Sequence, residues 1–379
     1  MSAVLVSRGI FSDDDSKSTK AVCPSEPSGT AIEPLVGNMT FQRVAEIVSG
    51  ACGIFSMLVI LAIIFKHARH YSNPIQQRQI IRIVLLIPWV SFFCWLIIFQ
   101  EGAGLYLLES LDFGCAIALS AFLLLLCDYI LQQEGGFDDL FGEGAWKRGQ
   151  FSKNSPPWLK RTWYSVLQFI PISLLLWLVT VITVAASVYC AQSNSIHFAH
   201  IWVQVIKVIF TTIAVLSILR FYKMMKAKLH VHNVFLKLFA FKGIIGLNAL
   251  QTFIISILVG HDVIKPSSSM SYDDLTTALP QLVLACEMPI FAVLLFFAFP
   301  TTPYQNAPIA QGTNFFIAVG QALNITDLIS CFIRGPMRLL REQSRGMVRQ
   351  DSIPLVQSSG NEYAAPGYHG AQGYAGPMA

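Results

Sequence analysis

The stretch ALPQLVLACEMPIFAVLLFFAF, residues 278–299, is long and apolar enough to cross a lipid bilayer as a helix, which takes about 20 residues. Glu287 lies near its middle, and Pro289 follows two residues later. A carboxylate at that depth costs about 2.5–3.5 kcal/mol or more unless another group compensates it. The stretch therefore predicts a membrane helix with a polar position that faces the interior of a helix bundle.

The rest of the chain repeats this pattern. Hydrophobic residues make up 54% of the sequence and charged residues 13%, against about 45–50% and 25% in a soluble domain. The composition and the recurring apolar blocks predict an all-α, polytopic membrane protein with a seven-transmembrane helix bundle. The predicted spans are residues 44–65, 80–99, 105–130, 166–190, 199–221, 235–260 and 278–299.

Basic residues alternate between the loops in a way that predicts the orientation. The loops after the first, third and fifth spans and the tail after the seventh are rich in Lys and Arg, whereas the loops between them carry almost none. Because basic loops stay in the cytosol, the N-terminus is expected on the non-cytosolic side and the C-terminus in the cytosol. Asn38, in the sequon Asn38-Met39-Thr40, is then a glycosylation candidate.

Four regions follow from this reading. Residues 1–43 are polar and are expected to be a disordered non-cytosolic N-terminus, and residues 44–300 form the membrane domain. Residues 301–350 are a cytosolic amphipathic tail segment, and the low-complexity residues 351–379 are expected to be disordered. Six cysteines in or beside apolar runs favour buried thiols over disulfides: Cys52, Cys94, Cys115, Cys127, Cys190 and Cys286.

Polar residues inside the spans fall on single helix faces. In the third span Glu109 and Asp112 share a face, and in the fifth span Lys207 lies on a stripe with neighbours three and four residues away. Such faces are expected to point into the bundle. The candidate residues of a solute or ion pathway are Glu287, Lys242, Asp112, Lys207, Gln251, Asn248 and Gln281.

Two interpretations of these charges stay open. The two deepest acids, Asp112 and Glu287, are matched in number by Lys207 and Lys242, so the four could pair only to hold the bundle together. Alternatively they line a pathway, because ionisable residues inside a membrane usually serve a function. Lys242 is the first expected partner of Glu287, and Lys207 is the second. Pro88, Pro171 and Pro289 are expected to break three spans.

Several segments resemble the organic solute transporter alpha-subunit / transmembrane protein 184 family. HARHYSNPIQQRQIIRIVLLIPWVSFFCW is similar to its first cytosolic loop and second span, FLKLFAFKGIIGLNALQ to its sixth span, and residues 278–299 to its seventh. ALNITDLI, residues 322–329, resembles the segment after the last span in fungal members. The residues that carry the resemblance are His67, Tyr71, Pro74, Gln77, Arg78, Arg82, Pro88, Trp95, Lys237, Lys242, Gln251, Gln281, Cys286, Glu287, Met288, Ala292, Phe299 and Tyr304.

The resemblance implies a seven-span protein that moves or binds amphipathic organic solutes such as sterol conjugates. It also implies a single-span partner subunit, with a homodimer as the other arrangement. Fungal relatives imply the alternative of a vacuolar membrane scaffold whose cytosolic tail recruits autophagy or trafficking partners, and they favour the vacuolar over the plasma membrane. No motif of an enzyme, a metal site, a cofactor or a nucleic-acid binder is present in a convincing context.

The tail segment 325–345 is expected to lie on the cytosolic leaflet of the bilayer. Leu328, Ile329, Phe332 and Ile333 share one face of a predicted helix, and Arg334, Arg338 and Arg341 lie on the other side. An apolar face with flanking arginines is typical of a helix that binds an anionic membrane surface. Cys331 within this segment is expected to face lipid, where it is a candidate for acylation.

Overall fold

The computed structural model describes residue 23 and residues 33–142, 156–191, 193, 195–230, 234–261, 263–305, 314–333 and 335–336. Across these residues the regular elements are helices, and the one extended pairing is an isolated bridge between Val36 and Met39. This confirms the predicted all-α fold. Residues 351–379, predicted to be disordered, lie outside the described part of the chain.

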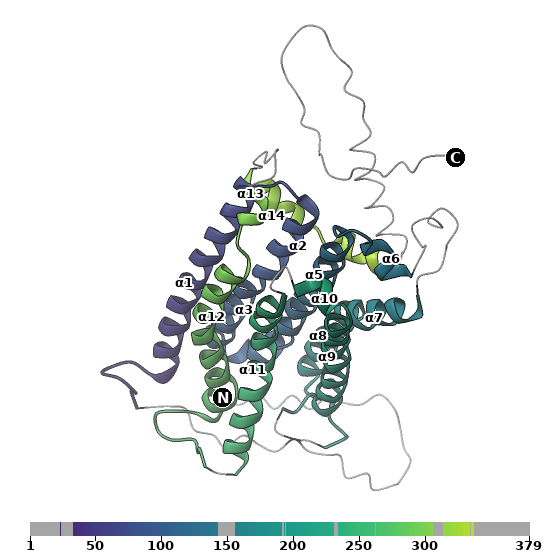
Figure 1. The fold of residues 1–379 in the computed structure, drawn as a ribbon. Coiled ribbons are helices and arrows are strands. Elements are labelled where there is room, and N and C mark those ends of the chain that lie inside the picture. Colours follow the sequence, from purple (N-terminus) through teal and green to yellow (C-terminus); the bar gives the residue numbers. More distant parts are fainter. Residues whose placement is uncertain are drawn as a thin grey trace, which may run out of the picture.

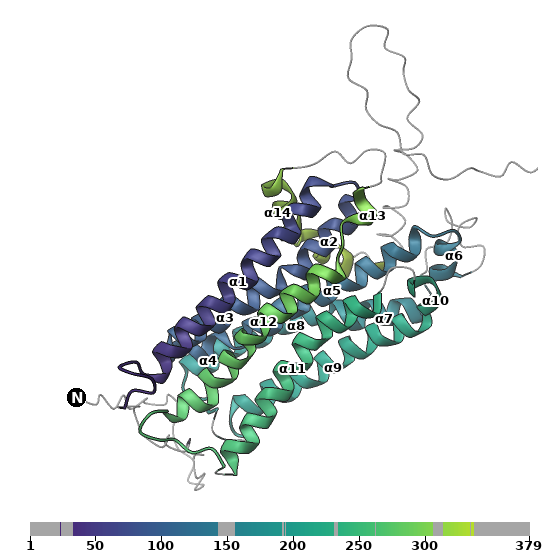
Figure 2. The same ribbon diagram turned by 60° about the vertical axis from the view of Figure 1, so that its left-hand side comes forward.

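The helices form an elongated bundle (Figures 1 and 2). One end of it holds α13, α14, α6 and α10, and we call it the α14 end; the other holds α4 and the start of α1, and we call it the α4 end (Figure 2). The bounds are α1 Phe41–Arg69, α2 Pro74–Val84, α3 Leu86–Phe99, α4 Gly104–Leu107, α5 Ser110–Leu131, α6 Gly136–Phe141, α7 Pro157–Leu167, α8 Phe169–Ala185, α9 Ala199–Met224, α10 Lys226–Leu229, α11 Val234–Gly260, α12 Leu279–Ala298, α13 Thr302–Gln305 and α14 Phe315–Leu323. A 3₁₀ turn, Glu101–Ala103, precedes α4, and a π turn, Asp274–Ala278, precedes α12.

Seven stretches of the described chain are long and apolar enough to cross a membrane, as predicted, so the chain is a multi-pass membrane protein. Six of them coincide with predicted spans. They are Phe41–Arg69, Pro74–Phe99, Gly104–Leu131, Pro157–Ala185, Ala199–Met224, Asp274–Ala298 and Phe315–Ile333.

One of the seven stretches differs from the prediction: Phe315–Ile333 takes the place of the predicted span 235–260. The predicted span 235–260 corresponds to α11, whose 27 residues extend about 40 Å and run beside α12 (Figure 2). Phe315–Ile333 was not predicted to span. It is divided at Asn324 into α14 and a second short helix, residues 326–333, and each is shorter than the roughly 30 Å core of a bilayer. This segment lies across the α14 end of the bundle (Figure 1).

Two of the three predicted proline breaks are present. The second span divides into α2 and α3 at Leu85, three residues before Pro88, and the fourth divides into α7 and α8 at Gln168, three residues before Pro171. Proline cannot donate to the carbonyl four residues earlier, so the helix reorganises there. The third prediction was wrong, because α12 continues through Pro289. α12 packs against α1, α3 and α11, which support it on several sides.

The interior of the bundle is built around α5, which packs against α2, α3, α7 and α8. Most α5 side chains are buried, including Phe122, Leu125 and Leu126 at 0% exposure. The outer helices instead leave large apolar side chains uncovered, for example Ile54, Ile182, Phe253 and Ile290. Uncovered apolar faces on several helices at once are what a bundle presents to lipid.

The N-terminal segment is fastened to two loops at the α4 end. Cys23 forms a disulfide with Cys190 in the α8–α9 loop, and the backbone N–H of Glu33 donates to the carbonyl of Ser268, 3.0 Å away. The prediction that Cys190 is a buried thiol was therefore wrong. A disulfide partner 167 residues away is set by the fold and not by local pattern. Asn38 is exposed in the turn just before α1. It lies two residues before Thr40, whose side chain caps the N-terminus of the helix.

Candidate functional site

The polar faces predicted on the third and fifth spans meet inside the bundle. Lys207 on α9 donates to Glu109 Oε1 at 2.9 Å, and its Nζ lies 3.6 Å from Asp112 Oδ2 on α5. The Glu109 side chain is only 2% exposed, so the ammonium stabilises an acid that water hardly reaches. The prediction that Lys207 is a second choice of partner for Glu287 was wrong, because Lys207 is engaged by these two acids.

Tyr189 extends this cluster toward the α4 end. Its ring meets the ring of His200 edge-on, with centroids 5.3 Å apart. Burial raises the pKa of Tyr189 to about 12; the Glu109 carboxylate adds to the rise, whereas Lys207 and hydrogen bonds with Gln204 and Thr180 oppose it. The hydroxyl therefore stays protonated at any physiological pH.

Glu287 and Gln251, both predicted site residues, meet between α12 and α11. The Gln251 amide Nε2 donates to Glu287 Oε1. The second carboxylate oxygen, Glu287 Oε2, and the amide oxygen, Gln251 Oε1, are buried atoms without a hydrogen-bond partner among the described residues. No basic side chain of the described residues lies within 4.0 Å of the Glu287 carboxylate. Among the described residues, the pair thus offers two hydrogen-bond acceptors without a partner between α11 and α12.

Of the three other residues predicted on these two helices, Gln281 does not join this pair. Gln281, also on α12, is buried at 4% exposure, and its Oε1 accepts from the Cys94 thiol of α3 at 3.3 Å. It therefore serves the α3 side of α12 and not the α11 side. The side chains of Lys242 and Asn248 lie outside the described part of the chain, although both positions belong to α11. An ion pair between Lys242 and Glu287 stays a prediction.

A buried polar network lies at the α14 end, and no function was predicted for it from the sequence. Lys237 of α11 is 7% exposed and donates to the Tyr129 hydroxyl of α5 at 2.8 Å. The Tyr304 hydroxyl donates to Gln76 Oε1 at 2.8 Å, and the His67 ring meets the Tyr304 ring with centroids 5.5 Å apart. Burial raises the pKa of Tyr304, so its hydroxyl remains a donor.

The same network contains unpaired groups. Asp128, which is 2% exposed, has one carboxylate oxygen without a hydrogen-bond partner among the described residues, and Gln76 Nε2 likewise has none. His67, Gln77, Lys237 and Tyr304 all carry the family resemblance, so their convergence was a signal already present in the sequence. Asp128 and Gln76 carry no such signal and were missed.

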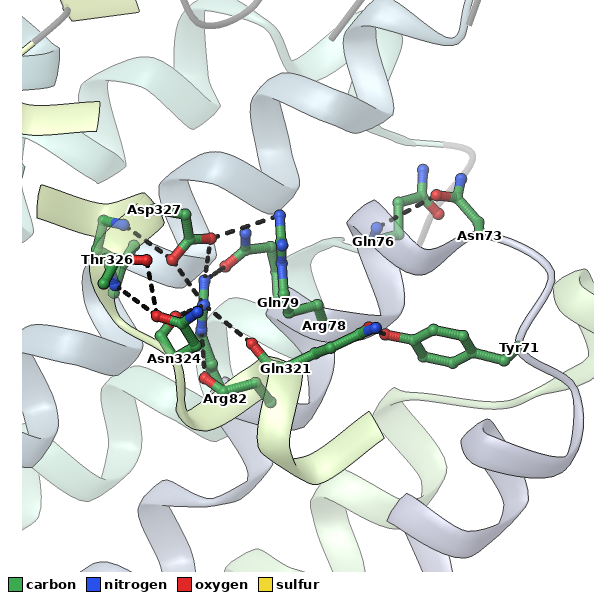
Figure 3. A network of polar contacts seen from close by, with 12 residues as sticks. Tyr71, Asn73, Gln76, Arg78, Gln79, Arg82, Gln321, Asn324, Thr326 and Asp327 are labelled. Carbon is green, nitrogen blue, oxygen red and sulfur yellow. Dashed lines mark hydrogen bonds and ion pairs between the residues drawn. The ribbon is translucent and has the colours of Figure 1, made fainter. Parts of the chain in front are cut away.

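A second network, shown in Figure 3, fastens residues 315–333 to α2. Arg82, with a side chain 2% exposed, holds both carboxylate oxygens of Asp327 at 2.7 and 2.8 Å, and Arg78 lies 3.4 Å from the same carboxylate. Arg82 also donates to the carbonyls of Ala322 at 2.7 Å and Asn324 at 2.6 Å, where α14 ends. A guanidinium with five donors suits this double task, since it binds a carboxylate in bidentate fashion and caps a helix C-terminus.

Tail residues predicted to face lipid are placed differently. Cys331 is 1% exposed, and its carbonyl accepts from the buried Trp163 indole at 3.0 Å. Leu328 is also 1% exposed, whereas Ile329 and Ile333 on the predicted common face are 50% and 73% exposed. The protein therefore buries Cys331 against the bundle, which removes it as an acylation candidate in this arrangement. Arg334, Arg338 and Arg341 lie outside the described residues.

Comparisons with known proteins agree with the resemblance. A family model described as organic solute transporter Ostalpha matches residues 45–304. A transmembrane protein 184 homolog from Dictyostelium discoideum is 25% identical over 262 residues, which cover 66% of this chain and 51% of that protein. The vacuole membrane protein hfl11 from Schizosaccharomyces pombe is 25% identical over 271 residues, which cover 67% and 62%.

The chain thus spans about half to three fifths of the length of these two relatives. The vacuole membrane relative is compatible with the predicted vacuolar location. No solved structure matches the chain.

Proposed function

Because the chain belongs to the organic solute transporter Ostalpha family, we propose that it binds an amphipathic organic solute inside its helix bundle and moves it across the membrane, with Glu287 and Gln251 as polar contacts. The observation that carries this proposal is the state of Glu287. Glu109 and Asp112 are compensated by Lys207, whereas the one partner of Glu287 among the described side chains is the neutral amide of Gln251.

Glu287 Oε2 and Gln251 Oε1 have no hydrogen-bond partner in the part of the chain that the structure describes, and these acceptors define what the solute must offer. In a bilayer interior no water is at hand to satisfy them, and an unmet buried acceptor costs about 1–3 kcal/mol. A hydroxyl on the solute would donate to one of these atoms and an amine to both, and the apolar body of the solute would lie against the apolar side chains of α11 and α12. The proposed solute therefore carries at least one hydrogen-bond donor on an otherwise apolar skeleton.

We further propose that the α4 end faces the non-cytosolic side and the α14 end the cytosol. The Cys23–Cys190 disulfide lies at the α4 end, and disulfides persist in oxidising compartments. The first, third and fifth spans, which the basic loops follow in sequence, end at the α14 end, as the positive-inside rule requires. In sealed vesicles, a tag placed before residue 40 should resist cytosolic protease and a C-terminal tag should not. Both tags on one side would contradict the orientation.

A second candidate function is a membrane scaffold whose cytosolic tail recruits trafficking partners. The observation that favours it is the docking of residues 315–333 on α2, which would fix the point from which the later residues extend. Removal of the residues after 336 would abolish a scaffold function and leave solute binding intact, so the two candidates are separable.

Replacing Glu287 with glutamine tests the solute proposal. Two facing amides at positions 251 and 287 can satisfy each other, which leaves no strong acceptor for the solute. A photoreactive sterol-like probe with one hydroxyl should label α11 and α12 near these positions in wild-type protein held in lipid nanodiscs. We expect Glu287→Gln to lower labelling about tenfold or more, since hydrogen bonds to charged groups contribute about 1.5–3 kcal/mol.

Two controls sharpen this experiment. Glu46→Gln removes a carboxylate that is paired with Arg43 at the start of α1, and it should leave labelling unchanged. A probe whose hydroxyl is methylated should label wild-type protein as weakly as the original probe labels Glu287→Gln. Equal labelling of both proteins by both probes would count against Glu287 as a solute contact.

A further inference from the structure

We propose that residues 315–333, which we call the cap, are a releasable closure of the α14 end of the bundle, held by Asp327 and its two arginines. Release of the cap would open the buried network around Lys237 and Tyr304 to water. The proposed function enters only as the use to which such an opening would be put; docking and release of the cap are tested without any solute.

The ion pairs between cap and bundle converge on one carboxylate (Figure 3). Asp327 accepts from Arg82 at 2.7 and 2.8 Å and lies 3.4 Å from Arg78. The arginine side of this latch is buried, with Arg82 at 2% side-chain exposure, whereas the Asp327 side chain is 24% exposed. Water and salt therefore reach the acid while the base stays fixed in α2, which is the arrangement expected of a contact that can be undone.

The cap has an apolar surface on both sides. Small or apolar residues on its inner side are almost completely buried, among them Ala318, Ala322 and Leu328. On its outer side Phe316 and Ile333 are 85% and 73% exposed. A short helical segment that is apolar on two sides has two stable places to lie, against the bundle or in the membrane interface. Leaving the bundle therefore does not require the cap to place a large apolar face in water.

The cap is connected to the buried network by a short series of contacts. The Tyr71 hydroxyl, in the turn before α2, donates to Gln321 Oε1 of the cap at 3.0 Å (Figure 3). The next residue, Ser72, donates to the carbonyl of Tyr304 at 3.1 Å, and the Tyr304 hydroxyl reaches Gln76 at 2.8 Å. Displacing the cap would thus loosen the turn that covers Tyr304.

The groups beneath give a reason for the opening to be accessible. Lys237 is 7% exposed, and no carboxylate oxygen of the described residues lies within 4.0 Å of its amine. Asp128 keeps one oxygen without a hydrogen-bond partner among the described residues. A buried ammonium without a carboxylate partner and a buried carboxylate oxygen without a hydrogen bond are both stabilised by water. Hydration of Lys237 and Asp128 would therefore offset part of the free energy lost when the cap leaves.

Two native side chains report the two halves of the proposal. Cys331 is a free thiol at 1% exposure on the inner side of the cap, so a charged maleimide reaches it only when the cap has left. Lys237 belongs to the buried network, so a charged acylating reagent reaches it only when the network is open. Full-length protein in nanodiscs would be treated with each reagent for increasing times, and modification at each residue would be quantified by peptide mass spectrometry.

In wild-type protein both residues should react far more slowly than in the denatured chain. In Asp327→Asn both should react about tenfold faster or more, because losing a hydrogen-bonded ion pair changes an opening equilibrium by at least that factor. Raising the salt concentration should accelerate modification of wild-type protein and have little effect on Asp327→Asn. The matched control is Glu46→Gln, which removes an acid held by an arginine at 2.7 Å at the opposite end, and it should leave both rates unchanged.

Each other outcome overturns the proposal. An unchanged Cys331 rate in Asp327→Asn would mean that the latch does not hold the cap. A faster Cys331 rate with an unchanged Lys237 rate would mean that the cap leaves without opening the network. A wild-type Cys331 rate equal to that of the denatured chain would mean that the cap is not docked. None of these results depends on whether the protein binds a solute.

Discussion

Methionine in place of Lys207 should prevent the protein from reaching its normal level in the membrane. The substitution keeps the length of the side chain but removes the ammonium that lies 2.9 Å from Glu109 and 3.6 Å from Asp112. Two acids inside the bundle then lack a base, and breaking a buried pair in this way costs about 3–5 kcal/mol. The free energy of unfolding of a typical domain is about 5–15 kcal/mol, so this loss is large. The measurement is the amount and thermal stability of detergent-extracted protein.

The matched control neutralises the two acids as well as the lysine, so that no unpaired charge is left in the cluster. A triple variant, Lys207→Met with Glu109→Gln and Asp112→Asn, should recover most of the lost stability, because replacing a buried ion pair completely is often close to neutral. If Lys207→Met alone is as stable as wild type, the cluster does not hold α5 and α9 together. If the triple variant is no better than the single one, the loss arises from packing of the lysine stem and not from unpaired charge.

Alanine in place of Arg82 should detach residues 315–333 from α2. The change leaves the Asp327 carboxylate without its bidentate partner and the carbonyls of Ala322 and Asn324 without donors. The expected loss is about 3–5 kcal/mol. It cannot exceed the free energy with which this segment docks, because the remaining bundle is unaffected once the segment has left. Limited proteolysis within residues 315–333 is the direct measurement, and cleavage should accelerate strongly.

Arg78 supplies the control for Arg82. It is four residues earlier on α2 and approaches the same carboxylate, but at 3.4 Å and with a side chain 28% exposed. Pairs of this exposed kind contribute about 0–1 kcal/mol, so Arg78→Ala should change cleavage little. Arg82→Lys should fall between the two, since an ammonium cannot serve a carboxylate and two carbonyls in one plane. Equal cleavage in Arg82→Ala and Arg78→Ala would contradict the role given to Arg82.

Composition and the pattern of apolar blocks placed the membrane helices well. The apolar blocks identified six of the seven candidate spans and the path of α11, since 20-residue apolar segments have few other uses. The proline rule located the breaks before Pro88 and Pro171 because the missing N–H is a local property. It failed at Pro289, where contacts of α12 with three other helices decide the outcome.

Helical wheels identified which faces are polar but not which faces meet. The stripe with Lys207 was correctly expected inside the bundle, yet its partners proved to be Glu109 and Asp112 and not Glu287. Periodicity fixes the direction of a side chain relative to its own helix, whereas the neighbour depends on how helices far apart in sequence are arranged. The pairing of Glu287 with Gln251 across α11 and α12 is of the same kind.

The tail shows the same limit more sharply. Apolar residues of 325–333 were assigned to the membrane surface by their pattern, but Leu328 and Cys331 pack against the bundle. The reason is Arg82, which is 245 residues from Asp327 along the chain and fully occupied by it and by the end of α14. The resemblance named Arg82 without a role, and nothing in the local sequence of the tail identified its partner. The Cys23–Cys190 disulfide is a long-range pairing of the same type.

Solute flux through Glu287→Gln tests the central claim most directly. Wild-type protein and the variant would be reconstituted at equal amounts into liposomes loaded with a hydroxyl-bearing sterol-like solute, and release would be followed over time. The expected result is clear release by wild type. Glu287→Gln should release solute only at the rate of loaded liposomes without protein, with both proteins equally folded. Release by Glu287→Gln at the wild-type rate would contradict a solute path that uses Glu287.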